Sequence, residues 1–395
     1  MQYIHRIQEE RVARALARNK SVLMLGPRQT GKTTLAGRLP WDLSLPFIRP
    51  EVRQRYEKEP DLLAQEVEAL KPKGPSHRPC VLLDEVQKVP GILDVVQDLI
   101  DRGKANFLLT GSSARKLRRE QGGNLLAGRV LALRLDPFAL SEMPAAALNQ
   151  HLLYGALPGI VALKSEQDKE TDLESYVTVY LEEEVRAEAI VRNLGSFARF
   201  LEYAASESGQ IVNLRKLSQE VGVSHTTIAS YYQILEDCLI AERIEPLTHS
   251  KTRKKLTKAQ KYLFFDPGVR RLAAREGPRL PKETMGALLE QFVGLELLRA
   301  CRLCDRKVRI RFWRDPGGPE VDWVIEEADA YVPIEVKWSS SPTPKDIKHL
   351  QLFLSEYRQA KVGYLVCRTP RRLKLADRLF ALPWQELDQL LLAPG

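Results

Sequence analysis

The chain has 395 residues, of which 44% are hydrophobic and 28% are charged, so it has the composition of a globular protein and enough length for two to three domains. No segment approaches the roughly 20 uncharged apolar residues that span a bilayer, and the N-terminus lacks the basic-then-apolar pattern of a secretory signal. We therefore expect a cytoplasmic protein without a membrane partner. The net charge of +9 indicates a polyanionic binding partner.

Residues 1–145 alternate apolar runs with helical patterns, which predicts an α/β domain with a parallel sheet. The strand expected at Ser21–Leu25 is followed by a complete G-x-x-x-x-G-K-T pattern. Its glycines let backbone N–H groups surround phosphates, its lysine would reach the β- and γ-phosphates, and its first threonine would bind Mg²⁺. The pattern predicts an ATP·Mg²⁺ site formed by Gly26, Pro27, Arg28, Gln29, Thr30, Gly31, Lys32, Thr33 and Thr34.

Two further expected strands, Val81–Leu83 and Phe107–Leu109, also end in polar residues. The first leads into Asp84, which would hold the magnesium, and Glu85, which would polarise the attacking water. An aspartate followed by a glutamate favours hydrolysis over phosphoryl transfer to a small metabolite. The second strand leads into Thr110, which we interpret as a sensor of the γ-phosphate, the alternative being a turn formed by Thr-Gly.

Hydrolysis of this kind often uses an arginine from a neighbouring subunit. We favour Arg129, in Leu-Ala-Gly-Arg beyond the sensor strand, although a surface salt bridge is an equal alternative. We therefore expect a closed homo-oligomer, most simply a hexamer. The other candidates are Arg115, Arg118 and Arg119.

The middle of the chain reads as helical. Residues 146–210 are expected to form a helical lid or linker, with one charged helix over Thr171–Arg192. Residues 211–275 read as a winged helix, with helices at Leu214–Val221 and Thr226–Cys238 and a hairpin from Leu239–Ile244 and Tyr262–Phe265.

Two sets of side chains in this winged helix are candidates for DNA contact, and packing between subunits is the alternative role. The second helix would present polar residues to a DNA groove, and the basic run KTRKK would lie in the wing against phosphates. The groove-facing candidates are His225, Thr226, Thr227, Ser230 and Tyr231, and the wing candidates are Lys251, Arg253, Lys254 and Lys255.

After a linker at 275–282, residues 283–395 again mix a helix with strands. Asp322 is followed by Glu335-Val336-Lys337 on a later strand, and Glu290 lies upstream in an apolar helix. Such acids inside apolar segments are costly unless a metal compensates them. The set resembles the D…E-x-K pattern of PD-(D/E)XK nucleases, with Asp322, Glu335 and Glu290 as ligands of Mg²⁺ or Mn²⁺ and Lys337 stabilising developing charge.

The five cysteines, an odd number spread along the chain, argue against a disulfide framework. Cys301 and Cys304 form an isolated C-x-x-C within a helical pattern, and no second pair completes a zinc site. We interpret both as core residues.

Segments along nearly the whole chain resemble, in order, the bacterial and archaeal AAA-type ATPases that carry an AAA+ domain, a winged helix and a nuclease-like domain of unassigned function. These segments are GPRQTGKTT, VLLDEVQKVP, LLTGSSARKL, LLAGRV, GALPGI, GALLEQFVGLELLR, EVDWVIE and PIEVKWSS. The resemblance implies an AAA+ core related to origin-recognition ATPases, ring assembly, and a C-terminal restriction-endonuclease-like fold similar to archaeal Holliday-junction resolvases. One departure is the sequence FIRPE at 47–51, where an acidic turn is expected.

The leading hypothesis is an ATP-driven machine that moves or remodels DNA, branched or forked by resemblance, and cuts it with the C-terminal domain. That would place it in DNA repair or recombination. The alternative is a nucleotide-switched, DNA-binding regulatory ATPase whose nuclease fold is silent. A metabolic kinase is a distant third, because it would explain neither the wing nor the C-terminal acids.

Overall fold

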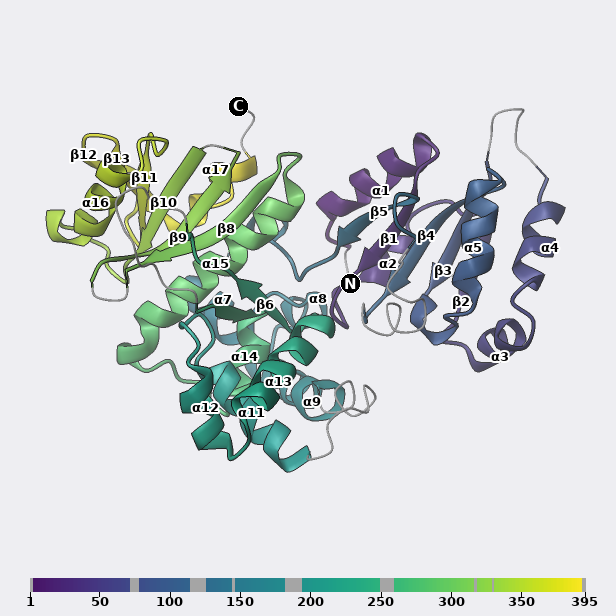
Figure 1. The fold of residues 1–395 in the computed structure, drawn as a ribbon, viewed down its shortest axis with the longest axis horizontal. Coiled ribbons are helices and arrows are strands. Elements are labelled where there is room, and N and C mark those ends of the chain that lie inside the picture. Colours follow the sequence, from purple (N-terminus) through teal and green to yellow (C-terminus); the bar gives the residue numbers. More distant parts are fainter. Residues whose placement is uncertain are drawn as a thin grey trace. The chain divides into compact units, whose positions relative to one another are not determined.

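The computed structural model describes residues 3–71, 78–113, 126–143, 146–181, 194–248, 259–315, 318–328 and 330–392. The chain divides into two compact units, residues 1–138 with 237–240 and residues 139–236 with 241–395 (Figure 1). Across the described ranges, none of the helices combines the length and the apolar character that crossing a bilayer requires.

The first unit is built on a five-stranded parallel sheet with the order β2-β3-β4-β1-β5. The predicted strands at 21–25, 81–83 and 107–109 are confirmed as β1, β3 and β4. The elements are α1 (Ile7–Ala17), β1 (Ser21–Leu25), α2 (Lys32–Ala36), β2 (Leu43–Pro46), α3 (Pro50–Lys58), α4 (Leu62–Ala69), β3 (Cys80–Asp84), α5 (Ile92–Asp101), β4 (Asn106–Gly111) and β5 (Val130–Arg134).

Alternate residues of each strand fill two different cores, as the period of a β-strand requires. Leu83 and Leu109 pack with α3, α4 and α5 on one face of the sheet. Leu82 and Leu108 pack with α1 and α2 on the other (Figure 1). The unit is thus a three-layer α/β/α sandwich, and the carboxyl ends of its parallel strands share one edge.

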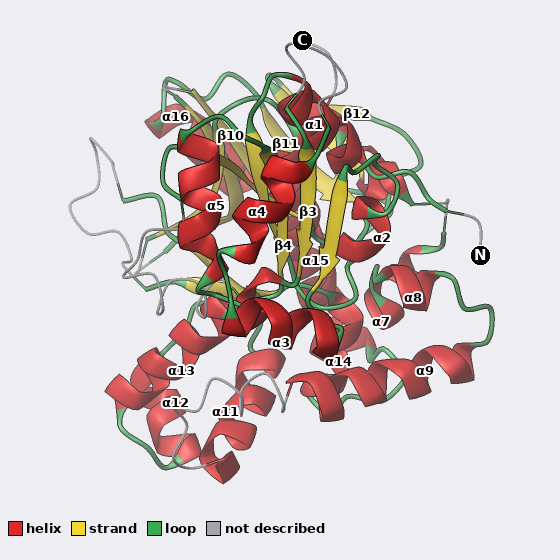
Figure 2. Ribbon diagram, turned by 90° about the vertical axis from the view of Figure 1, so that its right-hand side faces the viewer, coloured by secondary structure: helices red, strands yellow, loops and turns green. Residues whose placement is uncertain are grey.

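The second unit combines helices, a two-stranded hairpin and a six-stranded sheet with the order β12-β13-β11-β10-β9-β8. Helices are present at the two positions expected, 214–221 and 226–238, as α12 (Leu214–Val221) and α13 (His225–Asp237), and they lie beside α11 (Leu194–Ser206) (Figure 2). The first half of the unit contains α7 (Leu148–Tyr154), α8 (Pro158–Val161), α9 (Glu166–Ser175), α11 (Leu194–Ser206), α12 (Leu214–Val221), α13 (His225–Asp237), β6 (Ala241–Ile244), β7 (Lys261–Phe264) and α14 (Pro267–Ala273). The second half contains α15 (Met285–Leu303), β8 (Val308–Arg314), β9 (Glu320–Glu327), β10 (Ala330–Val336), α16 (Lys348–Glu356), β11 (Gly363–Cys367), β12 (Leu373–Ala376), β13 (Leu379–Pro383) and α17 (Gln389–Leu392).

One hydrophobic cluster of the second unit contains residues from both sides of the expected linker at 275–282. Leu152 of α7, Leu263 of β7, Phe292 of α15 and Trp323 of β9 belong to the same cluster. The reason lies in α15, which is buried on most of its sides and therefore contacts neighbours around much of its circumference.

The charged segment expected to form one helix over Thr171–Arg192 is not a single α-helix in the structure. The α-helical part, α9, ends at Ser175 and continues as a π-helix over Tyr176–Leu181. The rest of the expected helix lies outside the described residues.

Candidate functional site: a phosphate-binding loop, a helix-turn-helix and an acid cluster

The phosphate-binding loop connects β1 to α2 and has a backbone that needs its glycines. Gly31, which precedes α2, has a φ of 92°, a left-handed conformation that side chains disfavour. A Cβ at Gly26 would lie 2.3 Å from the carbonyl oxygen of Leu135. The local geometry therefore requires glycine at both positions of the sequence pattern.

A buried arginine from the N-terminal segment holds the backbone of this loop by hydrogen bonds. Arg6 donates hydrogen bonds to the carbonyl oxygens of Thr30 at 2.8 Å and Asp136 at 2.7 Å. Within the loop, the Thr30 hydroxyl donates to the Pro27 carbonyl at 2.9 Å. The sequence carries no motif that points to Arg6, because its partners lie 24 and 130 residues away.

The predicted magnesium ligands and the predicted sensor form one hydrogen-bond network. The Thr33 hydroxyl donates to Oδ2 of Asp84 at 2.9 Å, and the Thr110 hydroxyl donates to Oδ1. The hydroxyl of Thr110 in turn accepts from the backbone N–H of Glu85 at 3.0 Å. A threonine hydroxyl beside a buried carboxylate is a donor set that suits Mg²⁺, so the residues present fit the cation.

Lys32 is almost fully buried and lies within the loop. Its ammonium donates to the carbonyl oxygens of Gly26 and Pro27, both at 2.9 Å. The charge is thereby held at the concave side of the loop, where the pattern predicts phosphates. Of the other loop residues, Gln29 has a left-handed φ of 62° and, with Thr34, is exposed, and Arg28 is half-buried.

The predicted catalytic carboxylate is held by two residues that the sequence pattern did not single out. Glu85 follows β3 with a φ of 60° and a ψ of 47°, a left-handed conformation that is costly for a non-glycine residue. Its Oε2 accepts hydrogen bonds from the Gln87 amide and, at 3.4 Å, from the Ser112 hydroxyl. The Gln87 amide also donates to Ser112 at 3.0 Å. Gln87 and Ser112 therefore orient the carboxylate at the edge where Asp84 and Thr110 lie.

Arg129 lies at the amino ends of the parallel strands, opposite the carboxyl ends that carry the phosphate-binding loop. It immediately precedes β5, which is parallel to β1, so a five-residue strand of about 16 Å separates it from the loop edge. Its guanidinium makes a forked ion pair with Asp101, at 2.7 and 2.8 Å, and these bonds lower the pKa of the Asp101 carboxyl. Arg129 therefore does not reach the loop of its own chain, and the salt bridge that the sequence left open is present. Arg115, Arg118 and Arg119 lie outside the described residues.

Local capping interactions define the ends of the two helices of the helix-turn-helix and the turn between them. The Asn213 side chain caps α12, Gly222 ends this helix with a φ of 77°, and the Ser224 hydroxyl accepts from the N–H of Thr227 at 3.1 Å. His225, Thr226 and Ser230 are exposed and Thr227 is half-buried, whereas Tyr231 is buried.

Tyr231 does not face a groove as expected. Its ring packs against Phe197 at 5.0 Å and Phe200 at 5.2 Å, both on α11. Helix α13 therefore has two buried sides, and the sequence pattern of the helix alone indicated only one.

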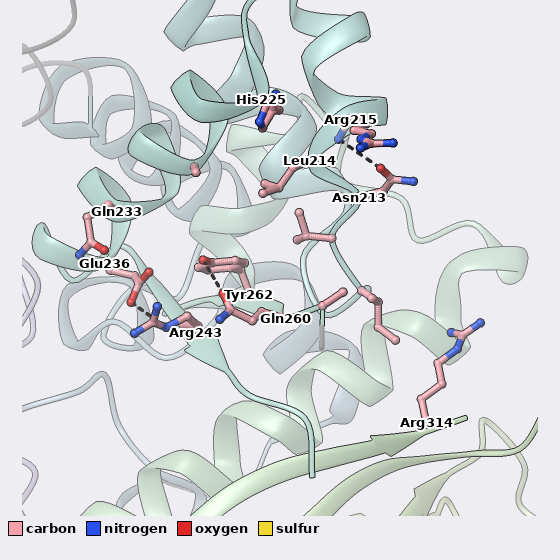
Figure 3. Close-up of a pocket in the computed structure, with 14 residues that line it drawn as sticks. Asn213, Leu214, Arg215, His225, Gln233, Glu236, Arg243, Gln260, Tyr262 and Arg314 are labelled. Atoms are coloured by element: carbon pink, nitrogen blue, oxygen red, sulfur yellow. Dashed lines mark hydrogen bonds and ion pairs between the residues drawn. The ribbon is translucent and has the colours of Figure 1, made fainter. Parts of the chain in front are cut away.

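A pocket of about 940 Å³ opens between the helix-turn-helix and the hairpin (Figure 3). Its lining includes His225, Arg215, Arg243 and Arg314, of which Arg243 pairs with Glu236 at 3.4 Å. Arg215 is exposed at the start of α12, where a phosphate could be met by both charge and helix N-terminus. The predicted wing residues Lys251, Arg253, Lys254 and Lys255 lie outside the described residues.

Asp322 and Glu335 lie on neighbouring antiparallel strands, β9 and β10. Oδ2 of Asp322 on β9 accepts from the backbone N–H of Val336 on β10 at 2.8 Å, so Asp322 lies beside Glu335. Oε1 of Glu335 accepts from the Lys337 ammonium at 2.8 Å, and its Oε2 is buried with no hydrogen-bond partner among the described residues. Burial, together with the charges of Glu290 and Glu335, raises the pKa of Asp322. Two buried carboxylates are thus positioned where a divalent cation would relieve their repulsion.

Glu290, the predicted third ligand, has a different partner. Its Oε1 forms an ion pair of 2.7 Å with the ammonium of Lys261, the first residue of β7. No group of three side chains able to hold a metal ion occurs in the part of the chain that the structure describes. The two strand acids therefore lie side by side without the predicted third ligand, because the helix acid is paired with a lysine that the sequence did not indicate.

Cys301 and Cys304 lie at the end of α15. Cys301 packs against the large core of the second unit, and burial raises the pKa of its thiol to about 12. The Cys304 thiol donates to the Cys301 carbonyl at 3.3 Å. Both are free thiols in a packed environment.

Comparison with known proteins identifies the class of the first unit. Residues 18–144 match the family described as an AAA domain, residues 145–279 match a domain of unknown function (DUF8612), and residues 285–387 match another (DUF4143). Together with the loop geometry, the first match defines residues 18–144 as an AAA-type P-loop ATPase domain.

The relatives and solved structures that resemble the chain are distant. Uncharacterized proteins of Mycobacterium bovis and Mycobacterium tuberculosis are each 27% identical over 394 residues, covering 96% of this chain and 83% of theirs. The Aeropyrum pernix ORC1 protein in complex with DNA is 14% identical, with a TM-score of 0.28 over 69% of this chain and 92% of its own. A Vibrio cholerae protein is 13% identical, with a TM-score of 0.21 over 93% of this chain and 96% of its own. Neither structure defines the overall fold at such scores.

Proposed function

We propose that the protein couples ATP binding and hydrolysis in its AAA-type domain to the binding of DNA through its helix-turn-helix. The observation that carries the proposal is the network that joins Thr33, Asp84, Thr110 and Glu85 at the carboxyl edge of the parallel sheet. Thr33, Asp84, Glu85 and Thr110 lie together at this edge, and Gln87 and Ser112 hold Glu85 there.

Each side chain has a defined task in this proposal. Lys32 exchanges the loop carbonyls for phosphate oxygens, and Thr110 reports the state of the site through its bonds to Asp84 and the Glu85 backbone. Glu85 orients and polarises the attacking water. Mg²⁺ held by Thr33 and Asp84 would neutralise charge that develops on the phosphates.

DNA binding is tested most directly at Arg215, one of three exposed arginines that line the pocket. We expect Arg215→Ala to weaken binding of a duplex severalfold at all sequences and to reduce the slope of log affinity against log salt by about one, because one phosphate contact is lost. Fluorescence anisotropy over a salt series measures both effects. The matched control is Arg358→Ala, which removes the same charge from an exposed site on the six-stranded-sheet side of the unit. If both variants bind equally well with equal slopes, the DNA contact lies elsewhere.

We also propose that the ATPase works as a homo-hexamer in which Arg129 acts on the neighbouring subunit. Arg129 cannot reach its own loop, and its exposed ion pair with Asp101 is weak enough to be exchanged. Arg129→Ala should then keep ATP binding and lose turnover, and mixing it with Lys32→Ala should restore part of the activity, since some sites combine an intact lysine with an intact arginine. Turnover that is unchanged in Arg129→Ala, or light scattering that shows a monomer with ATP and DNA, contradicts this arrangement.

DNA cleavage by the C-terminal domain is a second candidate function, favoured by Glu335, which lies beside Asp322 and whose buried Oε2 has no hydrogen-bond partner within the described ranges. Asp322 and Glu335 would hold Mg²⁺ or Mn²⁺, Lys337 would stabilise charge at the phosphate, and branched DNA is the substrate that the sequence resemblance suggests. Asp322→Asn should abolish metal-dependent cleavage and leave ATP turnover unchanged, with matched melting profiles as the control. Wild-type protein that cuts no single-stranded, duplex, forked or four-way DNA with either cation would establish the silent-fold alternative.

A further inference from the structure

Lys261 is an unusual neighbour for the C-terminal acids, because it comes from the hairpin of the winged helix. Its side chain is about nine-tenths buried and its ammonium lies 2.7 Å from Oε1 of Glu290. The same ammonium lies 4.8 Å from the centre of the Trp323 ring and 5.1 Å from that of Phe312. A buried ammonium is costly unless it is paired, so these three contacts hold the charge in one place.

The field of Lys261 extends beyond Glu290 to the strand acids. Lys261 and Lys337 both act to lower the pKa of Asp322, against the larger effects of burial and of Glu290 and Glu335. Three carboxylates and two ammonium groups therefore share this cluster. A divalent cation bound by Asp322 and Glu335 would meet an additional positive charge where its third ligand should be.

We propose that the ammonium of Lys261 serves as the cation of this cluster. By pairing with Glu290, it keeps a divalent cation from binding all three of the predicted ligands. The inference rests on the cleavage site proposed above, and it assigns the control of metal loading to the hairpin strand β7. Metal would enter only when Lys261 leaves Glu290.

Mn²⁺ binding to the full chain without nucleotide tests this, with free Mn²⁺ followed by electron paramagnetic resonance. Lys261→Met keeps the aliphatic stem and removes the charge, so it should bind one Mn²⁺ at least about tenfold more tightly than wild type. Lys261→Arg, which keeps the charge, should show no gain. Lys261→Met combined with Asp322→Asn should lose the gain, which assigns the new site to this cluster rather than to Thr33 and Asp84.

Lys261→Gln, whose amide still donates to Glu290, provides a second neutral variant should the methionine disturb folding. The inference is overturned if either folded neutral variant binds Mn²⁺ no better than wild type, or if wild type already binds Mn²⁺ tightly in a manner that Asp322→Asn abolishes. Cleavage is scored separately. A variant that gains Mn²⁺ but cuts no DNA removes the cleavage proposal and leaves the role of Lys261 intact.

Discussion

Replacing Lys32 by alanine is expected to lower ATP turnover by at least about 100-fold, the effect of removing one strong donor from a developing oxyanion. Lys32 is the buried cation of the loop, and its ammonium is held by the carbonyl oxygens of Gly26 and Pro27. Without it, the loop loses the buried cation that would face the β- and γ-phosphates. Phosphate release under saturating ATP measures the loss.

The control for this prediction is Lys104→Ala, which removes an exposed lysine of the same unit after α5. It should retain wild-type turnover. Both variants need a melting profile, because the buried ammonium of Lys32 also satisfies two backbone carbonyls and its loss costs about 1–3 kcal/mol if they stay unpaired. Wild-type turnover in folded Lys32→Ala would mean that ATP is hydrolysed at another site.

Glu85→Gln is expected to separate ATP binding from hydrolysis. The substitution keeps the shape of the side chain and removes the charge that polarises the water, so turnover should fall by about 10²–10⁴-fold. Asp84, Thr33 and Lys32 are untouched, so affinity for ATP should stay within a few-fold of wild type. Equilibrium binding of a fluorescent ATP analogue and single-turnover hydrolysis measure the two properties independently.

The outcome that contradicts this role of Glu85 is a variant that binds and hydrolyses ATP as the wild type does. Loss of binding would instead indicate that Glu85 supports the loop. The left-handed backbone at this position, with a φ of 60°, is no more costly for glutamine than for glutamate, so the fold should be retained.

The sequence predicted the elements that depend on local pattern. Ser21–Leu25 and Leu214–Val221 have the bounds that the sequence indicated, because apolar runs and helical periodicity next to glycine determine them locally. Arg6 and Gln87 were missed because their tasks arise only when distant segments meet. Arg6 contacts the loop across 24 residues, and no motif marks it.

The same contrast holds in the second unit. The D…E-x-K pattern grouped Asp322 with Glu335, and these residues lie on neighbouring strands. The burial of Tyr231 was not predicted, since it depends on α11 packing against a second side of α13. The pairing of Lys261 with Glu290 had no signal in the sequence, because one lies in the hairpin and the other in α15.

The coupling of nucleotide state to DNA binding is tested most directly by one comparison of DNA affinity. Glu85→Gln retains ATP, so its affinity for duplex DNA is measured by anisotropy with and without ATP·Mg²⁺, beside Lys32→Ala under the same conditions. The account predicts that ATP changes the affinity of Glu85→Gln by at least about fivefold, the lower range of a typical coupling, and leaves that of Lys32→Ala unchanged. Equal DNA affinities for Glu85→Gln with and without bound ATP would contradict the coupling.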